Sequence, residues 1–245
     1  MDCLMVKNAK TTGIWLLFLG LLIGQPACAQ HLQPHFEAAE YHELLLIALR
    51  TTDNEKYYRK YPAPQQFDMV YRSQEMGLDN RWQLWVNHQH TIAVVSIRGT
   101  TTRPASSLAN LYAAMVPATG TLHLTANDTF AYQLAAHPRA AVHTGWLVSM
   151  AFLVRDIRPR IDSLYRAGIR DIILTGHSQG GAIVYLLTAY LHYQQQQGAL
   201  PHDIRFKTYC SAAPKPGNVY FAYDYETAIP AGWSLTVVNA ADWVP

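Results

Sequence analysis

Residues 171–181, DIILTGHSQGG, decide how this chain folds. The apolar run at residues 172–174 predicts a buried strand, and it ends in GHSQG, a G-x-S-x-G motif centred on Ser178. A serine on so tight a strand-to-helix turn is lifted clear of the sheet, and the start of the helix directs backbone N–H groups toward the same place. The stretch predicts a nucleophile at Ser178 and a need for glycine at Gly176 and Gly180, where side chains would collide.

The segment after Ser178 favours this interpretation over a chance match. Apolar side chains recur there at the spacing of one helix face, at Ile183, Leu186, Leu187, Tyr190 and Leu191. Three fixed motif positions alone would occur by chance in roughly one chain in ten of this length. The interpretation therefore depends on the strand, turn and helix context, and the alternative is a glycine-rich connection with an inert serine.

The rest of the chain alternates predicted strands with predicted helices. Strands are predicted at residues 81–87, 91–97, 172–174, 204–209 and 235–238, and helices at residues 37–50 and 146–167. The first two strands form a candidate hairpin, whereas residues 51–66 are expected to be a loop or short irregular helix. The alternation predicts an α/β fold with a mostly parallel sheet and helices on both faces. Because reactive groups in such sheets lie at the carboxyl ends of strands, we expect Ser178, Thr100 and Asp242 to share one pocket there.

Residues 1–29 are typical of a signal peptide. Two lysines precede the apolar stretch GIWLLFLGLLIG, which is too short to span a bilayer comfortably, and A-C-A then fits a small-x-small cleavage site ending at Ala29. We expect a mature, secreted or periplasmic chain of one domain over residues 30–245. An uncleaved N-terminal anchor and lipid attachment at Cys28 are the alternatives.

Composition excludes several classes of function. The formal net charge is +2, and no run of Lys or Arg indicates a nucleic-acid partner. No C-x-x-C or H-E-x-x-H motif predicts a metal site. After signal cleavage only Cys210 remains, so no intrachain disulfide is expected, and Cys210 is interpreted as a small buried apolar residue.

Four motifs, in the same order, resemble those of the class 3 (fungal-type) triacylglycerol lipases of the α/β-hydrolase fold. They are IRGT at 97–100, VHTGW at 142–146, TGHSQGG at 175–181, and the pair PKPGNVYF at 214–221 with VNAADWVP at 238–245. The resemblance covers the chain from about residue 94 to residue 245. Two positions depart from the family pattern: Gln179 stands where Leu is usual, and SLAN at 107–110 stands where the family has W-x-x-D.

The resemblance implies a serine ester hydrolase acting on acylglycerols, without metal or organic cofactor. Ser178 would be the nucleophile and Asp242 the triad acid, whereas Asp203 and Asp224 are other acids that lack the motif. The backbone N–H of Gln179, with the N–H and hydroxyl of Thr100, would form the oxyanion hole.

Other substrates and roles remain open on the same scaffold. Phospholipase A1, feruloyl or other carbohydrate esterase, and a non-catalytic lipid-binding relative are the alternatives. The resemblance gives His143 a packing role. It also implies that the segment after Thr100 carries a lid, and apolar residues at helical spacing fit either a lid or an ordinary core helix there: Leu108, Leu111, Tyr112, Met115 and Val116.

The histidine of the triad is absent from these 245 residues. The order in this fold is Ser, Asp, His, and all eleven histidines precede Asp242. His177 is expected to point away from the nucleophile. We therefore expect a C-terminally truncated sequence that hydrolyses esters slowly, because loss of the base costs several orders of magnitude in rate. The alternative is a natural protein that has lost catalysis.

Overall fold

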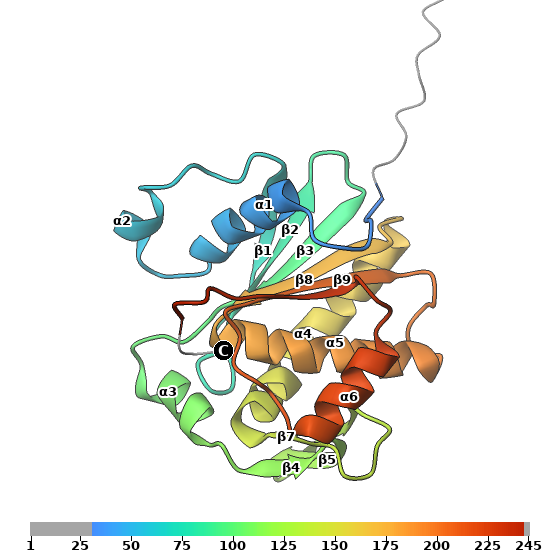
Figure 1. The fold of residues 1–245 in the computed structure, drawn as a ribbon. Coiled ribbons are helices and arrows are strands. Elements are labelled where there is room, and N and C mark those ends of the chain that lie inside the picture. The colour runs from blue at the N-terminus through green and yellow to red at the C-terminus, as the bar shows by residue number, and fades with distance from the viewer. Residues whose placement is uncertain (1–30, 243–245) are drawn as a thin grey trace, which may run out of the picture.

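A six-stranded sheet forms the centre of the molecule in the computed structural model, which describes residues 31–242 (Figure 1). Across the sheet the order is β1 (Phe67–Arg72), β2 (Trp82–Asn87), β3 (Ile92–Ile97), β8 (Asp171–His177), β9 (Arg205–Ser211) and β10 (Ser234–Val237). The strands β3, β8, β9 and β10 are parallel, and β1, β2 and β3 pair antiparallel. The mostly parallel sheet and the β2–β3 hairpin are therefore confirmed.

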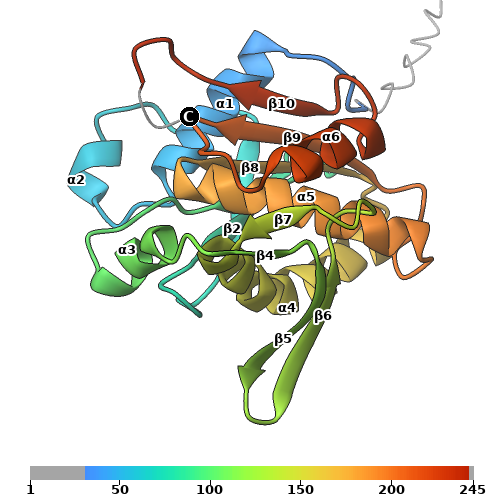
Figure 2. The same cartoon turned by 60° about the horizontal axis from the view of Figure 1, so that its bottom comes forward.

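Helices cover both faces of this sheet, as the sequence predicts. In Figures 1 and 2, α1 (Ala38–Leu49) lies on one face, and α4 (Thr144–Arg166) and α5 (Gln179–Gln196) lie on the other. Alternate residues of each strand supply the two cores: Val94 and Ile173 pack with α1, whereas Val95 and Leu174 pack with α4 and α5. The short helix α6 (Val219–Ala228) lies beside α5.

The stretch that gave no clear sequence pattern, residues 100–141, contains several short elements. They are α3 (Pro104–Leu111), β4 (Met115–Pro117), the hairpin of β5 (Thr119–Thr125) with β6 (Asp128–Gln133), and the start of β7 (Ala141–His143), which pairs with β4. The expected irregular segment after α1 holds one helical turn, α2 (Glu55–Tyr58). Strand β1 was not predicted, because most of its side chains are exposed and its sequence has no long apolar run.

The sequence predicts a signal peptide at the start of the chain and a buried cysteine at position 210. The signal peptide predicted at residues 1–29 lies outside the described residues. Cys210 is completely buried in β9, as expected, and desolvation by this burial raises the pKa of its thiol. Within residues 31–242, none of the helices combines the length and the apolar composition needed to cross a bilayer.

Candidate active site

Ser178 occupies the predicted sharp turn between β8 and α5. Its backbone has φ 56° and ψ −125°, a conformation that residues with a side chain rarely adopt. Two backbone hydrogen bonds hold the turn, from the Ser178 N–H to the Ser211 carbonyl at 2.9 Å and from the Ala182 N–H to the Ser178 carbonyl at 3.1 Å. The side chain is half-buried. The fold thus presents a hydroxyl at the carboxyl end of a central parallel strand.

The glycines around this turn are required by close approach of the backbone. A Cβ atom added at Gly176 would overlap the backbone of Gly180, and one added at Gly180 would overlap the carbonyl oxygen of Ile97. The backbone of the turn at Ser178 is therefore in close contact both across the turn and with the end of β3. This contact is the collision expected from the G-x-S-x-G motif.

Thr100 lies beside Ser178 because β3 runs next to β8, with Ile97 opposite Gly176. A Cβ atom at Gly99 would lie 2.7 Å from the His177 carbonyl oxygen and 3.9 Å from the Ser178 Cβ. The Thr100 hydroxyl accepts a hydrogen bond of 3.0 Å from Nδ2 of Asn110. Since that bond uses an oxygen lone pair, the hydroxyl proton of Thr100 stays available to a developing oxyanion.

Ser178 and Thr100 line the same cavity, which has a volume of about 800 Å³. One wall of it comes from the N-terminal part of the chain, from Leu45 and Leu49 of α1 and from the segment that follows α1. The rings of Tyr57 and Tyr61 lie at this wall, 5.6 Å apart in an edge-on arrangement. The sequence did not predict this wall. Its one signal in the sequence is the abundance of tyrosine in residues 51–66.

A group of ion pairs joins this wall to the end of β3. This arginine–carboxylate cluster consists of Arg81, Arg98 and Arg103 with Asp53, Glu75 and Asp79. The buried Arg98 guanidinium donates to Asp53 at 2.9 Å, to Glu75 at 3.2 Å and to the Asp79 carbonyl at 2.8 Å. Burial alone would raise the pKa of the Asp53 carboxyl, but the hydrogen bond from Arg81 and the nearby arginine charges lower it. The cluster therefore favours the ionised form of Asp53 at the cavity.

Asp242 lines a different, adjoining cavity of about 490 Å³. The two cavities share the side chains of Leu45 and His177. The structure therefore brings Ser178 and Thr100 together as expected, whereas the expected single pocket does not include Asp242. A triad acid touches the imidazole rather than the serine, so a carboxylate one side chain away from Ser178 fits that arrangement.

His177 stands at the boundary of these two cavities. Its Nδ1 lies 3.2 Å from the Ser211 hydroxyl. The surrounding protein desolvates the imidazole and lowers its pKa, and the negative charge of Asp242 opposes that effect. His177 is thus mainly neutral at physiological pH.

Gln179 contributes its side chain to the site, in addition to the backbone N–H that the family resemblance assigns to the oxyanion hole. Its side chain is buried, and its Nε2 donates to the Ser106 carbonyl at 3.1 Å. The Ser106 hydroxyl in turn donates to Oε1 of Gln179 at 3.2 Å. The residue after the serine is therefore tied to α3.

His143 lies at the start of α4, where it packs rather than facing the cavity. Its ring stacks on Trp146 with centroids 3.8 Å apart. Its Nε2 is 3.1 Å from the Asn110 carbonyl, so this nitrogen carries the proton, and its Nδ1 accepts the Trp146 N–H at 3.4 Å. The bond accepted at Nδ1 requires the neutral imidazole, whereas Nε2 can donate in either protonation state.

Acidification is expected to destabilise the protein through His143. Burial lowers the pKa of His143 below its ordinary value of 6.5, although the hydrogen bond to Asn110 opposes this. The contribution of neutral His143 to the free energy of unfolding is therefore complete above pH 6.5, the ordinary pKa of the group. This contribution is lost as the pH falls through the lowered pKa, because the protonated ring cannot accept a hydrogen bond at Nδ1. Urea unfolding of the protein and of His143→Gln between neutral and acidic pH measures this, and parallel pH profiles would contradict it.

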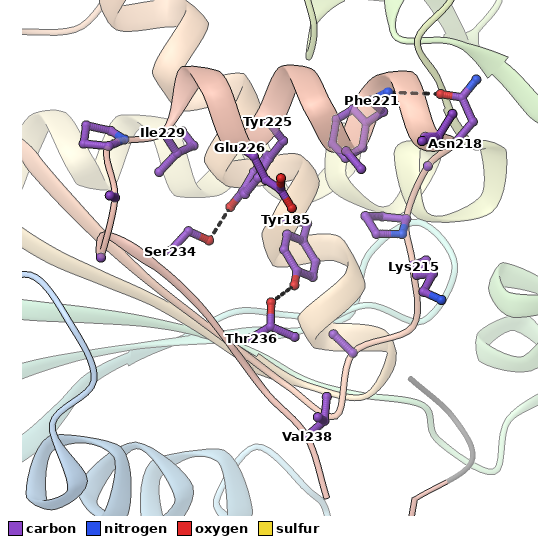
Figure 3. A pocket seen from close by; sticks show the side chains of 18 residues that line it. Tyr185, Lys215, Asn218, Phe221, Tyr225, Glu226, Ile229, Ser234, Thr236 and Val238 are labelled. Atoms are coloured by element: carbon purple, nitrogen blue, oxygen red, sulfur yellow. Dashed lines mark hydrogen bonds between the residues drawn. The ribbon is translucent and has the colours of Figure 1, made fainter. Parts of the chain in front are cut away.

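A second large cavity, of about 790 Å³, lies between α5, α6 and β10 (Figure 3). Its tyrosine hydroxyls are already paired, Tyr185 with Thr236 and Tyr225 with Ser234. Burial raises the pKa of both tyrosines, so they stay protonated at neutral pH.

In the described part of the chain, no group of three or more His, Cys, Asp or Glu residues is placed to hold a metal ion. The candidate nucleophile therefore points to the cavity of Ser178 as the active site.

Solved lipase structures share this fold. A lipase from Rhizopus microsporus var. chinensis superimposes with a TM-score of 0.56 and 22% identity, over 91% of this chain and 74% of that one. A triacylglycerol lipase from Penicillium expansum gives 0.58 and 19%, over 86% and 74%. The Lip2 lipase from Yarrowia lipolytica gives 0.58 and 19%, over 88% and 76%. At these identities the likeness establishes the α/β-hydrolase fold.

Sequence comparison gives the family. No curated protein sequence matches the chain. The family model described as lipase (class 3) matches residues 94–245, which is more than half of the chain and the same region as the four motifs. The chain therefore belongs to the class 3 lipase family.

Proposed function

We propose that this protein is a secreted serine ester hydrolase that cleaves acylglycerol esters through an acyl-enzyme on Ser178. The observation that supports the proposal is the placement of the Ser178 hydroxyl, on a positive-φ turn, in one cavity with Thr100. Secretion is proposed from the sequence of residues 1–29. Membership of the lipase family supports a lipid ester as the substrate.

The proposed reaction has two steps. Ser178 Oγ bonds to the ester carbonyl carbon, and the resulting oxyanion accepts hydrogen bonds from the Gln179 N–H and from the N–H and hydroxyl of Thr100. The C–O bond to the alcohol then breaks, and the alcohol leaves with the proton that the serine gave up. Water attacks the acyl-enzyme, releases the fatty acid and restores the serine. Each oxyanion donor is worth about 3 kcal/mol of transition-state stabilisation.

A general base must take the serine proton in this scheme. We assign Asp242 as the acid that would orient such a base, because the imidazole of a Ser–Asp–His triad lies between the hydroxyl and the carboxylate. All eleven histidines of the sequence precede Asp242, so none stands at the position that the order Ser, Asp, His gives to the base. In assays of residues 1–245, an external imidazole is expected to supply part of this base function.

The chemistry of the cavity agrees with an apolar ester. Apolar surface in the cavity of Ser178 comes from Leu45, Leu49, Tyr57 and Tyr61. An acyl chain buried against such side chains is stabilised by about 0.8 kcal/mol per methylene group. We therefore expect longer acyl chains to react faster than acetate until the cavity is filled.

Reaction with a fluorophosphonate tests the proposal directly. Mass spectrometry is expected to find the probe on Ser178, with a labelling rate that rises with added imidazole. Ser178→Ala is the control and is expected to remain unlabelled, because it lacks the nucleophile. No labelling of Ser178 in the folded protein, with or without imidazole, would refute the proposed function and favour a lipid-binding relative.

The substrate is tested in the same imidazole-containing buffer. Tributyrin, a phosphatidylcholine and a feruloyl ester are compared, each with Ser178→Ala as the background. The proposal expects Ser178-dependent release of butyrate to exceed release from the other two esters. Preference for the phospholipid or the feruloyl ester would reassign the substrate while retaining the serine mechanism.

A further inference from the structure

The side chain of Gln179 forms a closed pair of hydrogen bonds with α3. Gln179 is 2% exposed and Ser106 is 1% exposed, so both groups are shielded from water. Each residue donates to the other, at 3.1 Å through the Gln179 amide and at 3.2 Å through the Ser106 hydroxyl. The first turn of α5, which follows the proposed nucleophile, is thereby fastened to α3.

The same helix holds the segment that carries the proposed oxyanion donor. The Ser106 hydroxyl oxygen accepts the Thr101 N–H at 3.0 Å. Asn110, one turn further along α3, donates to the Thr100 hydroxyl at 3.0 Å. The position of α3 therefore sets the position of both threonines.

A second set of contacts fixes the far end of α3 against α4. Asn110 accepts the Trp146 indole N–H at 3.0 Å through its side chain and is 3.1 Å from His143 Nε2 through its carbonyl. A Cβ atom at Gly145 would overlap the carbonyl of Ala109, so the two backbones touch. Both ends of α3 are thus anchored through its inner face, while Leu108 and Leu111 on its outer face are exposed.

We propose that Gln179 is a positioning residue that makes α3 a fixed support of the oxyanion site rather than a lid. Movement of α3 away from the turn at Ser178 would leave the buried amide of Gln179 and the hydroxyl of Ser106 without hydrogen-bond partners, which costs free energy. A leucine at position 179 would carry no such penalty. The site is then assembled without a lipid surface, and Gln179 acts on Thr100 through α3, whose Ser106 binds the Thr101 N–H and whose Asn110 binds the Thr100 hydroxyl. The part of this inference that concerns turnover rests on the proposed function.

Hydrogen–deuterium exchange tests the anchoring without any need for activity. In Gln179→Leu, amides of residues 101–112 are expected to exchange at least tenfold faster than in the unchanged protein, and those of α4 to stay the same. Ser106→Ala removes the hydroxyl that donates to Gln179 and accepts the Thr101 N–H but keeps the carbonyl that binds the Gln179 amide, so it is expected to accelerate exchange in the same residues. The matched control is Gln196→Leu at the exposed far end of α5, where the amide contacts only His192 among the described partners. Equal exchange of residues 101–112 in Gln179→Leu and in the unchanged protein would overturn the proposal.

Kinetics in imidazole-containing buffer test the effect on the site. With a soluble butyrate ester, Gln179→Leu is expected to lower kcat about tenfold with little change in KM, because a donor used in the transition state is misplaced. For the unchanged protein, the rate on tributyrin is expected to rise smoothly through the solubility limit. A sharp increase at that limit would overturn the fixed position of α3. Absence of all Ser178-dependent turnover would refute the proposed function, and hydrogen exchange would still decide whether Gln179 anchors α3.

Discussion

Replacing Arg98 with methionine is expected to lower the free energy of unfolding by about 3–5 kcal/mol. Three arginines face three carboxylates in the arginine–carboxylate cluster, and Arg98 is the one that lies deepest, at 3% exposure. Methionine fills a similar length but removes the charge. The cluster would then hold an excess carboxylate next to Asp79, whose side chain is only 5% exposed. Urea unfolding followed by tryptophan fluorescence measures the loss.

The control for this variant is Arg59→Met. Arg59 and Glu55 form an ion pair on α2 whose side chains are 72% and 58% exposed. Removing an exposed pair of this kind is expected to change stability by less than about 1 kcal/mol. Equal losses in Arg98→Met and Arg59→Met would show that burial of the cluster does not matter. Because Asp53 belongs to the cavity wall, Arg98→Met is also expected to loosen that wall from the end of β3.

Replacing Lys207 with methionine is expected to cost a similar amount, about 3–5 kcal/mol. The Lys207 ammonium lies 2.5 Å from Glu40, and the two side chains are 2% and 17% exposed. The Tyr209 hydroxyl also donates to Glu40, at 2.6 Å. Without the lysine, the Glu40 carboxyl loses its cationic partner in a largely buried position between α1 and β9. The midpoint and slope of urea unfolding report this loss.

The double variant Lys207→Met with Glu40→Leu separates the pair from its parts. Buried ion pairs are often no more stabilising than apolar residues of similar size, so the second change is expected to recover much of the stability. Losses that simply add would show instead that Lys207 and Glu40 contribute independently and that the ion pair has no coupling energy. Either single change is expected to affect the cavity of Ser178, since α1 also carries Leu45 and Leu49.

The sequence predicted those strands, turns and helices that a short continuous stretch of residues encodes. The strand at 172–174, the turn at Ser178 and the helix after it form one continuous pattern, and the structure contains all three. The family resemblance from residue 94 onward agrees with the family match. Strand β1 was missed because its hydrophobic signal is weak, and its pairing with β2 contains a bulge near Met69.

The remaining parts of the candidate site depend on contacts between distant segments. Asp53, Glu75 and Arg98 meet only after α1, β2 and β3 have packed, and no periodic pattern encodes their pairing. The side-chain role of Gln179 was invisible for the same reason, because its partner Ser106 lies 73 residues earlier in the chain. The motif around Asp242 predicted an acid, but its place in a cavity next to that of Ser178 depends on how β9, β10 and α1 pack together.

The hairpin of β5 and β6 projects from the body of the molecule (Figure 2). Its tip, at Ala126 and Asn127, is exposed, and the start of β6 next to the tip is tied to α4 by a bond from Arg155 to the Thr129 carbonyl at 3.1 Å. Neither tip residue lines the cavity of Ser178. An epitope spliced between them, or a tether to a solid bead, would meet only solvent, so the immobilised protein would still admit esters to its interior.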